Sequence, residues 1–578
     1  MIEKNDIFTA VTDAIGSNGE GIIRHEGITF FVPACLPGER VTVRVLKVKG
    51  NIGYGKAEEI LTPAEERVRP KCPVFSKCGG CCLQHLDYPA QLAHKATVVK
   101  DALRKIGGLR MDVPNAIKSD NPYGYRNKLQ IPVGRDKDGN TVIGFYAEHS
   151  HRIVPINSCA IHPEWADKLI AIVKRYMTEC VVKGYDEETK KGSLRHIVAR
   201  EIGGKYIVTL VTAKRELPNV PYLIGLLSEA FRFVTVYLNF NDSDTNVIFG
   251  EEFQLVHGTG VFEAEEQGIR YEAGPVTFLQ VNENVRTKLY KDALKTVAQD
   301  GDEVVIDAYS GGGLLTAMIA TKVKRVYGIE LEKEASKCAD SLKAKNGLDN
   351  MINICGYVEE KLPAVLEKEK GEKLRLILDP PRAGIARSVL KALLESGIPK
   401  LTLISCNPAT LARDLGILTG RLIEEEGELV KNPAYADVAE GETLEGYYEV
   451  EKIQPYDMFP QTKHVETLVQ LSHKKPATNL EVALDFENSE VESSLVDLET
   501  RVKSKETVKV TYKMIQEYIE EKYGFKVHTA YIAEVKRELG LPMYDAPNAV
   551  EELKKPRQHP TEKMVEAIKD ALKYFEII

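Results

Sequence analysis

One cysteine, Cys406, lies at a position in the sequence that is typical of a catalytic nucleophile. Cys406 follows an apolar run at residues 401–404 and one serine, and Asn407-Pro408 comes directly after it. The apolar run predicts a buried strand, and the Asn-Pro pair turns the backbone out at the strand end. A structural cysteine would more often lie inside such a run, packed as a small hydrophobic residue. The placement therefore favours a catalytic thiol.

Three further apolar runs end in polar or glycine-rich residues. Residues 379–382 (Asp-Pro-Pro-Arg) follow the run at 376–378, and residues 307–313 (Asp-Ala-Tyr-Ser-Gly-Gly-Gly) follow another. Glycines let backbone amides approach a ligand at the start of a helix. About twenty residues on, the next run ends in Glu330, whose carboxylate suits ribose hydroxyls. A dinucleotide fold would show Gly-x-Gly-x-x-Gly here, so the pattern favours an adenosyl ligand without pyrophosphate.

Four other cysteines have the spacing of a metal centre. Cys72, Cys78 and Cys81 are clustered, and Cys159 follows in a polar turn. Thiolates at this density hold zinc or an iron–sulfur cluster, since both take soft sulfur ligands. Zinc sites usually show two Cys-x-x-Cys pairs or include histidine, so a [4Fe–4S] cluster fits better, with zinc left open. Cys82 adjoins the group as a spare or competing ligand.

The composition is that of a globular protein with several domains. The chain has 578 residues, of which 43% are hydrophobic and 28% charged. Its start lacks the order of a signal peptide, and no apolar run approaches the about 18 residues of a membrane span. We therefore expect a cytoplasmic monomer without membrane contact, whose ten cysteines stay reduced.

The net charge of −8 argues mildly against a nucleic-acid partner. The acidity is concentrated in two segments, however. Residues 480–500 carry seven acidic residues and no basic one, and residues 424–449 carry nine acidic residues and one lysine. The first segment is typical of a linker and the second of an insertion. Without them the chain has no net negative charge, so charge does not exclude RNA.

The elements that position these residues change character along the chain. Residues 1–63 predict a small OB-like β-barrel, as a scaffold or for RNA contact. A helix at 88–106 has a basic face (Lys95, Lys100, Arg104, Lys105) and is able to pack on the catalytic domain. Residues 64–265 predict a mainly β region for metal and RNA binding. Within it, residues 125–128 (Tyr-Arg-Asn-Lys) are either a solvated strand start or a base-and-phosphate contact.

The rest of the chain predicts two further domains. Strands and helices alternate over 266–473, which favours a doubly wound, Rossmann-like α/β domain with parallel pairing. Residues 474–504 are expected to be an acidic linker. Residues 505–578 predict a separate small helical module of unknown role, in which two apolar helix faces about a glycine turn are typical of a helix-turn-helix. Its nearly balanced charge leaves protein and nucleic-acid contacts equally open.

On these motifs the chain resembles the uracil-5 RNA methyltransferases, and within them the 23S rRNA branch with a TRAM barrel and a [4Fe–4S] cluster. The resemblance covers about residues 1–472. It rests on the cysteine spacing, on the strand-end motifs, and on residues 278–282 (Phe-Leu-Gln-Val-Asn), 457–460 (Asp-Met-Phe-Pro) and 464–467 (His-Val-Glu-Thr).

The resemblance implies a role for each motif residue. Cys406 would add to C6 of uracil, and Glu466 would remove the C5 proton. Arg382 would stabilise charge on O4. The contacts to S-adenosylmethionine would be Gln280, Tyr309, Gly311, Glu330 and Asp379. The cluster ligands would be Cys72, Cys78, Cys81 and Cys159.

Three alternatives remain open. The tRNA branch performs the same chemistry, but the resemblance implies that it lacks the barrel and the cluster cysteines. A non-catalytic iron–sulfur RNA-binding protein would tolerate loss of Cys406 or Glu466. Purine N-methylation would need an aromatic residue where the chain has Arg382. Considered one at a time, these residues also have structural interpretations: Glu466 as an exposed strand carboxylate and Asp379 as a helix cap.

Leu314 and the 424–449 insertion depart from the family pattern, so the target uridine stays open.

Overall fold

The structure is a computed structural model that describes residues 2–425, 427–435, 438, 442–474, 512–523, 525, 527, 531–532, 535–536 and 561–574. The chain divides into two compact units, Met1–Thr478 and Asn479–Ile578. The predicted acidic linker and most of the second predicted helix of the C-terminal module lie outside the described residues. Over the described ranges, every helix is too short or too polar to cross a membrane.

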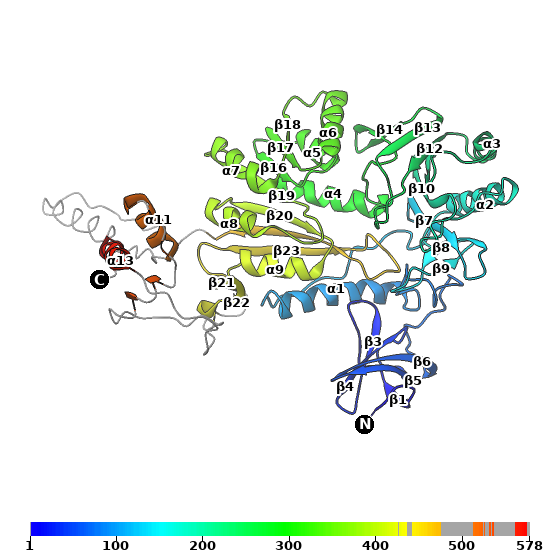
Figure 1. Cartoon of the computed structure of the whole chain (residues 1–578), viewed down its shortest axis with the longest axis horizontal. Coiled ribbons are helices and arrows are strands. Elements are labelled where there is room, and N and C mark those ends of the chain that lie inside the picture. The colour runs from blue at the N-terminus through cyan, green and yellow to red at the C-terminus, as the bar shows by residue number, and fades with distance from the viewer. Residues whose placement is uncertain are drawn as a thin grey trace. The chain divides into compact units, whose positions relative to one another are not determined.

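The N-terminal strands form one sheet (Figure 1), which encloses a small apolar core. Its strands are β1 (Ile7–Val11), β2 (Ala14–Ile15), β3 (Glu20–His25), β4 (Ile28–Pro33), β5 (Arg40–Lys49) and β6 (Ile52–Thr62), in the order β1-β5-β6-β4-β3-β2. Alternate residues of β5 point inward, so Val41, Val43 and Val45 are buried against Phe30. The strict alternation of this segment thus produces a strand with one buried face.

A mixed sheet follows α1 (Tyr88–Lys105) in the order β13-β12-β11-β10-β7-β8-β9. Its strands are β7 (Lys128–Arg135), β8 (Thr141–Tyr146), β9 (Ile153–Pro155), β10 (Leu194–Ile202), β11 (Lys205–Thr212), β12 (Val234–Phe240) and β13 (Glu252–His257). The helices α2 (Glu164–Glu179) and α3 (Val220–Ala230) pack on it, which the expectation of a mainly β region missed. The signal for α2 was the apolar spacing of Trp165, Leu169, Val173 and Tyr176, all buried.

A second seven-stranded sheet has the order β18-β17-β16-β19-β20-β24-β23. Its strands are β16 (Val304–Ala308), β17 (Arg325–Glu330), β18 (Met351–Cys355), β19 (Leu374–Leu378), β20 (Lys400–Ser405), β23 (Tyr448–Tyr456) and β24 (Glu466–His473). The strands from β18 to β20 are parallel, as predicted, but β24 and β23 are antiparallel. A loop at 457–465 joins these two strands, and without a crossover helix they cannot pair in parallel.

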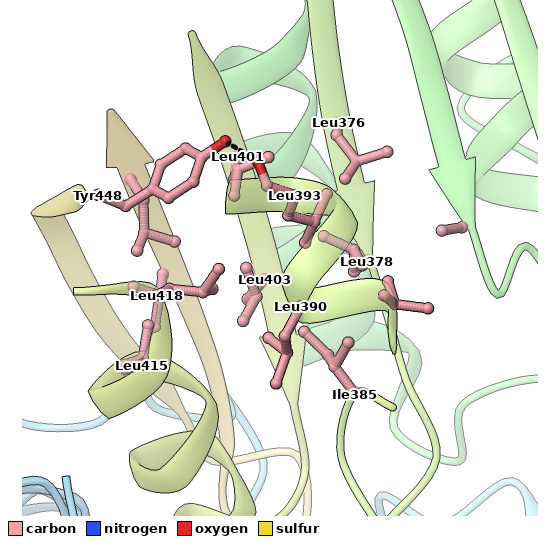
Figure 2. Packing of buried hydrophobic residues seen from close by; sticks show 14 of the residues in the cluster. Leu376, Leu378, Ile385, Leu390, Leu393, Leu401, Leu403, Leu415, Leu418 and Tyr448 are labelled. Atoms are coloured by element: carbon pink, nitrogen blue, oxygen red, sulfur yellow. Dashed lines mark hydrogen bonds between the residues drawn. The ribbon is translucent and has the colours of Figure 1, made fainter. Parts of the chain in front are cut away.

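Helices flank this second sheet. They are α4 (Glu283–Val297), α5 (Leu314–Ala320), α6 (Lys333–Asn346), α7 (Val358–Lys368), α8 (Arg387–Ser396) and α9 (Pro408–Leu418). Leucines of α8 and α9 pack against leucines of β19 and β20 (Figure 2). The helix α1 packs along α9, and a Cβ at Gly107 would come within 2.4 Å of the Ala412 carbonyl oxygen. This close approach requires glycine just beyond α1.

Three smaller parts complete the described structure. β14 (Phe262–Glu266) pairs with β15 (Ile269–Ala273). In the acidic segment 424–449, β21 (Leu422–Glu425) and β22 (Glu428–Lys431) form a hairpin that η1 (Pro433–Tyr435) follows, and β23 begins at Tyr448. The C-terminal unit contains α11 (Tyr512–Tyr523) and α13 (Glu562–Tyr574). Ile515 and Ile519 of α11 are buried, as their spacing predicted, whereas α13 was not predicted.

Candidate active site

Cys406 and Glu466 come from neighbouring antiparallel strands. Ser405, the last residue of β20, forms the final pair with Thr467 of β24. Cys406 and Glu466 are the next residues beyond this pair, and the charge of Glu466 reaches the Cys406 thiol. Asn407 caps α9, and its side chain accepts a hydrogen bond from the Ala409 N–H at 3.1 Å. The thiol therefore lies between a strand end and a helix N-terminus, where backbone amides favour a thiolate.

The surroundings of these two residues oppose ionisation. Burial raises the pKa of the Cys406 thiol, and the charge of Glu466 raises it further, whereas Arg382 lowers it. Glu466 is only 3% exposed, so it is not the exposed strand carboxylate of the alternative interpretation. Burial raises the pKa of Glu466 to about 8, Asp379 adds to the effect and Arg382 opposes it. A carboxyl group with a pKa near neutrality is suited to proton transfer.

Two more carboxyl groups lie at the same edge of the sheet. Asp379 follows β19, and burial raises its pKa to about 7. It does not cap the next helix, α8, whose N-cap is Ala386. Asp307 of β16 accepts a hydrogen bond from the Thr316 hydroxyl at 2.6 Å. Burial nevertheless raises the pKa of Asp307 to about 7, with a further rise caused by Asp379. Asp307 was not a predicted site residue, although its strand-end position was the available signal.

The glycine loop after β16 is open on its outer side. The Gly311 N–H donates to Glu330 Oε2 at 2.7 Å, which ties the loop to the end of β17. A Cβ at Gly311 or Gly312 would meet no atom within 4 Å, so protein packing does not explain these glycines. Tyr309 has a φ of 67°, a left-handed conformation that non-glycine residues rarely adopt. The open backbone and the remaining lone pairs of Glu330 fit an adenosyl group with ribose hydroxyls.

Gln280 lies in the loop between β15 and α4. Its carbonyl accepts a hydrogen bond from Arg286 Nη1 at 3.1 Å, and the Leu279 carbonyl accepts one from Arg200 Nη1 at 3.2 Å. The Asn127 N–H donates to the Val281 carbonyl at 2.9 Å. The loop backbone is therefore fixed from two sides. Over the described residues, no hydrogen bond joins the Gln280 side chain to the other predicted site residues.

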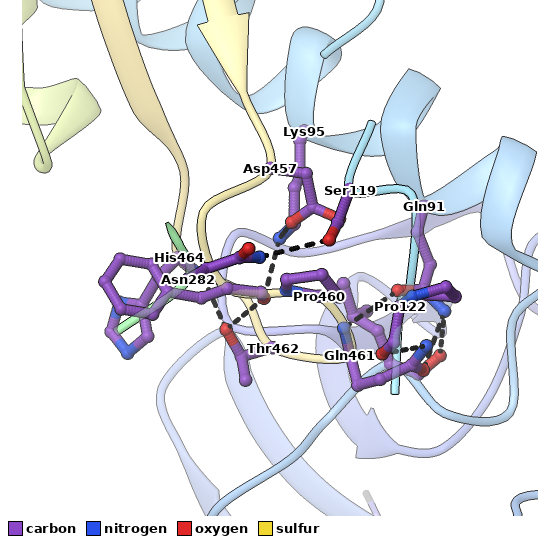
Figure 3. A network of polar contacts seen from close by, with 12 residues as sticks. Gln91, Lys95, Ser119, Pro122, Asn282, Asp457, Pro460, Gln461, Thr462 and His464 are labelled. Atoms are coloured by element: carbon purple, nitrogen blue, oxygen red, sulfur yellow. Dashed lines mark hydrogen bonds and ion pairs between the residues drawn. The ribbon is translucent and has the colours of Figure 1, made fainter. Parts of the chain in front are cut away.

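The loop that precedes Glu466 is held by a buried network (Figure 3). Lys95 of α1 is 1% exposed and forms an ion pair with buried Asp457, and its ammonium also donates to the Phe459 carbonyl at 3.0 Å. Gln91 donates to Gln461 Oε1 at 3.0 Å, and the Gln461 N–H donates back to Gln91 Oε1 at 3.1 Å. The helix α1 thus fixes the loop from which Glu466 emerges.

The four predicted metal ligands converge. Burial raises the pKa of Cys81 to about 12, and negative charge on Cys159, Cys78 and Cys72 raises it further. Among the described residues, no three of these sulfurs all lie within 4.8 Å of one another. Sulfurs bound at about 2.3 Å to one zinc ion would lie about 3.8 Å apart.

Cys82, the fifth cysteine of this segment, packs against the barrel. Burial raises the pKa of its thiol to about 11, and the charges of Lys95 and Lys463 oppose this rise. A Cβ added at Gly19 of the barrel would come within 3.0 Å of the Cys82 sulfur. The Cys82 N–H donates to the Gln461 carbonyl at 3.1 Å, so this residue also contacts the loop before Glu466.

Known proteins match this architecture over most of its length. A family model described as tRNA (Uracil-5-)-methyltransferase matches residues 87–426, and a TRAM domain model matches residues 8–57. An uncharacterized RNA methyltransferase of Clostridium tetani is 38% identical over 476 residues, which are 82% of this chain and 97% of that protein. One from Listeria innocua is 35% identical over 82% of this chain and 99% of its own length.

A solved structure gives the same result. The crystal structure of Pyrococcus abyssi tRNA (uracil-54, C5)-methyltransferase in complex with S-adenosyl-L-homocysteine is similar with a TM-score of 0.62 and 25% identity. The similarity covers 80% of this chain and 99% of that one. It confirms the predicted Rossmann-like methyltransferase fold. The chain therefore belongs to the family of S-adenosylmethionine-dependent uracil-5 RNA methyltransferases, and it carries a TRAM domain on its N-terminal side.

Proposed function

We propose that the protein methylates C5 of a uridine in 23S rRNA, with Cys406 as the nucleophile and Glu466 as the base. The observation that carries this proposal is that both residues lie directly beyond the last pair of β20 and β24, where the charge of Glu466 reaches the Cys406 thiol and Asp379 also lies. A thiol and a carboxyl group that lie side by side are suited to act on two adjacent ring carbons.

The chemistry requires both residues because uracil C5 is a poor nucleophile. The Cys406 thiolate forms a bond to C6, and the electron pair of the C5–C6 double bond moves toward C5 and O4. Bound S-adenosylmethionine supplies the methyl group that C5 accepts. Glu466 then takes the C5 proton, the double bond forms again, and the Cys406 sulfur leaves with its electron pair. Arg382, whose charge reaches both residues, would balance the charge on O4.

The cofactor would be held along the strand ends. Glu330 would accept hydrogen bonds from the ribose hydroxyls, and the open backbone at Gly311 would lie against the adenosyl group. Asp379 would face the sulfonium charge, with Tyr309 and Gln280 as the remaining contacts. The raised pKa of Asp379 supports this role, because a nearby cation would stabilise its ionised form.

We infer that Cys72, Cys78, Cys81 and Cys159 hold a [4Fe–4S] cluster with a structural role, which joins the central region to the segment before α1. The convergence of four thiols supports this assignment. Iron and sulfide analysis of anaerobically purified protein tests it, with about four of each expected per chain. Zinc without sulfide would contradict it.

Transfer RNA is the second candidate substrate. The choice of 23S rRNA rests on the barrel together with the four cysteines, which the family resemblance associates with that branch. The Pyrococcus abyssi tRNA enzyme, however, is matched over 99% of its length. This match weakens the expectation that tRNA enzymes lack the present architecture.

Mass spectrometry of covalent complexes tests the proposal. The protein is mixed with S-adenosylmethionine and 5-fluorouridine-substituted fragments of 23S rRNA or tRNA. Fluorine leaves Glu466 no C5 proton to remove, so the adduct accumulates. We expect it in the wild type and in Cys355→Ala, an exposed cysteine at the end of β18, but not in Cys406→Ala. An adduct on tRNA alone would replace the rRNA assignment, and no adduct on either RNA would overturn the chemistry.

A further inference from the structure

Three cationic side chains lie close together at the start of β7 and on its neighbour β10, in the mixed sheet. Lys128 of β7 and Arg200 of β10 are directly opposed in the antiparallel register. Opposed residues have their side chains on the same face, only about 5 Å apart at Cβ. Arg126 precedes Lys128 by two residues, and its Nε donates to the Lys128 carbonyl at 3.2 Å. We call Arg126, Lys128 and Arg200 the cationic trio.

The trio has no anionic partner in the part of the chain that the structure describes. Arg200 is only 5% exposed, yet no described carboxylate forms an ion pair with any of the three. The next cation, Arg286, is already paired with Glu266. Burial lowers the pKa of Lys128 to about 8, and the charges of Arg200 and Arg126 lower it further. Opposed like charges destabilise a sheet, so the free protein bears an electrostatic cost here.

The trio borders both loops of the candidate active site. Arg200 donates to the Leu279 carbonyl in the loop that carries Gln280. The hydroxyl of Tyr125 donates to the Pro460 carbonyl at 3.1 Å, in the loop before Glu466. The Tyr125 side chain is therefore attached to that loop. The charge of Arg126 also reaches His464, two residues before the base. An anion held by the trio would thus lie beside the reacting base.

We propose that the cationic trio binds a backbone phosphate of the RNA next to the uridine that enters the active site. This inference rests on the proposed function, because it assumes that a uridine is the nucleotide that enters the site. A phosphodiester supplies the negative charge that the three cations lack, together with acceptor oxygens for their remaining N–H groups. Such contacts fix the register of a nucleic acid without reading its sequence. Holding the backbone there would keep an unstacked nucleotide in the cleft, which otherwise costs a few kcal/mol.

The variant Lys128→Met separates this role from a structural one. It removes one of the repelling charges and leaves the hydrogen bond of Arg200 to Leu279 in place. We expect the Tm of the free variant to equal or exceed that of the wild type. We expect its affinity for RNA to fall roughly tenfold at low salt. The slope of log K against log salt should become shallower by about 0.7 to 1, the value for one lost phosphate contact.

Fluorescence anisotropy with a uridine-containing single-stranded RNA, without cofactor and at several salt concentrations, measures these values. The matched control is Lys137→Met, an exposed lysine in the turn between β7 and β8. A neutral methylphosphonate linkage beside the uridine should weaken binding to the wild type but not to Lys128→Met. An unchanged slope in Lys128→Met, or an equal loss in Lys137→Met, overturns the proposal.

A second arm distinguishes the phosphate from the carboxylate of the methyl donor. Calorimetric titration with S-adenosylmethionine should give the same affinity for Lys128→Met and the wild type. A loss of that affinity would assign the trio to the donor and overturn the phosphate site. RNA binding is measured without methyl transfer. A failure of C5 methylation would therefore refute the proposed function and leave this test of the trio intact.

Discussion

At the scale of single residues, the candidate active site gathers groups whose surroundings disfavour negative charge. Burial raises the pKa of Asp307, Asp379 and Glu466, and also that of the Cys406 thiol. A positively charged ligand among these groups would offset the cost of ionising them. The free site is therefore suited to a cation such as a sulfonium. It follows that the Cys406 thiolate should form more readily once the methyl donor is bound.

The sequence predicted that several of the site residues lie close together, but it did not predict their protonation states. Cys406, Asp379 and Glu330 follow apolar runs, and the ends of parallel strands share one edge of a sheet. The burial of Glu466 was not predictable in this way. It depends on β20, which pairs beside it, and on a loop held by a helix more than 300 residues earlier in the chain.

We expect the affinity for S-adenosylmethionine to rise as the pH increases through about 7. The pKa of Asp379 is about 7 in the free protein, against an ordinary value of 3.8, and a bound cation favours the ionised form. Binding therefore lowers this pKa, so protonation competes with binding at lower pH. Calorimetry across this range measures the effect. In Asp379→Asn we expect weaker binding with a smaller pH dependence, and a flat wild-type profile would contradict the role of Asp379.

We expect Glu466→Gln to gain stability relative to the wild type as the pH rises. The pKa of Glu466 is about 8 in the folded protein and an ordinary 4.5 when unfolded, so the folded state binds this proton more tightly. The free energy of unfolding of the wild type therefore falls between about pH 4.5 and 8, a loss that the glutamine variant does not share. Thermal unfolding at both ends of this window measures the difference. An equal difference at both ends would contradict the raised pKa.

At the scale of elements, the site depends on a helix that comes early in the chain. Lys100, Arg104 and Lys105 of α1 are exposed, as expected for a basic face, but Lys95 is buried. Its spacing was the signal, because Gln91, Lys95, Val99 and Leu103 recur every four residues and all are buried. The partner of Lys95, Asp457, is 362 residues away, so no local pattern reveals the pair.

For the strands, too, the sequence predicted the elements but not all of their long-range pairing. Four strands of the second sheet, β16, β17, β19 and β20, were predictable from their apolar runs, because they are buried on both faces. The antiparallel pairing of β23 and β24 was not, since it depends on the loop between them and on the register with β20.

We expect Lys95→Met to destabilise the protein by about 3–5 kcal/mol, because it leaves the Asp457 carboxylate buried and uncompensated. The double variant Lys95→Met with Asp457→Leu should regain most of this loss, since replacing a buried ion pair with apolar residues is often neutral. Urea unfolding of the three proteins measures the effect, and Lys100→Met, an exposed lysine of α1, is the control. A single variant as stable as the wild type would mean that the pair is dispensable.

At the scale of the first unit, three regions meet at the loop before Glu466. The Lys463 ammonium donates to Asn18 of the barrel at 2.9 Å. The N–H groups of Cys82 and Leu83 both donate to the Gln461 carbonyl at 3.1 Å. The loop is also hydrogen-bonded to α1, so it is attached to the barrel, to the cysteine segment and to this helix. The barrel and the cysteine segment are therefore directly connected to the loop that precedes Glu466, the proposed base.

This arrangement predicts the result of removing Cys78, one of the four proposed metal ligands. In Cys78→Ser we expect loss of iron, a lower Tm and weaker RNA binding, because the segment 72–82 loses its anchor to Cys159. Hydrogen exchange should accelerate at Cys82 and Leu83, whose N–H groups bind Gln461. Alkylation of Cys406 should change less, since β20 and α9 position it independently.

The control for this experiment is Cys180→Ser, a half-buried cysteine at the end of α2 that lies outside the metal group. It should keep its iron and its RNA affinity. If Cys78→Ser lost iron but kept its folding and RNA affinity, the metal group would not be a structural anchor. If Cys406 alkylation changed as much as exchange at Cys82, the metal group would act on the nucleophile itself, and the independence of β20 would be wrong.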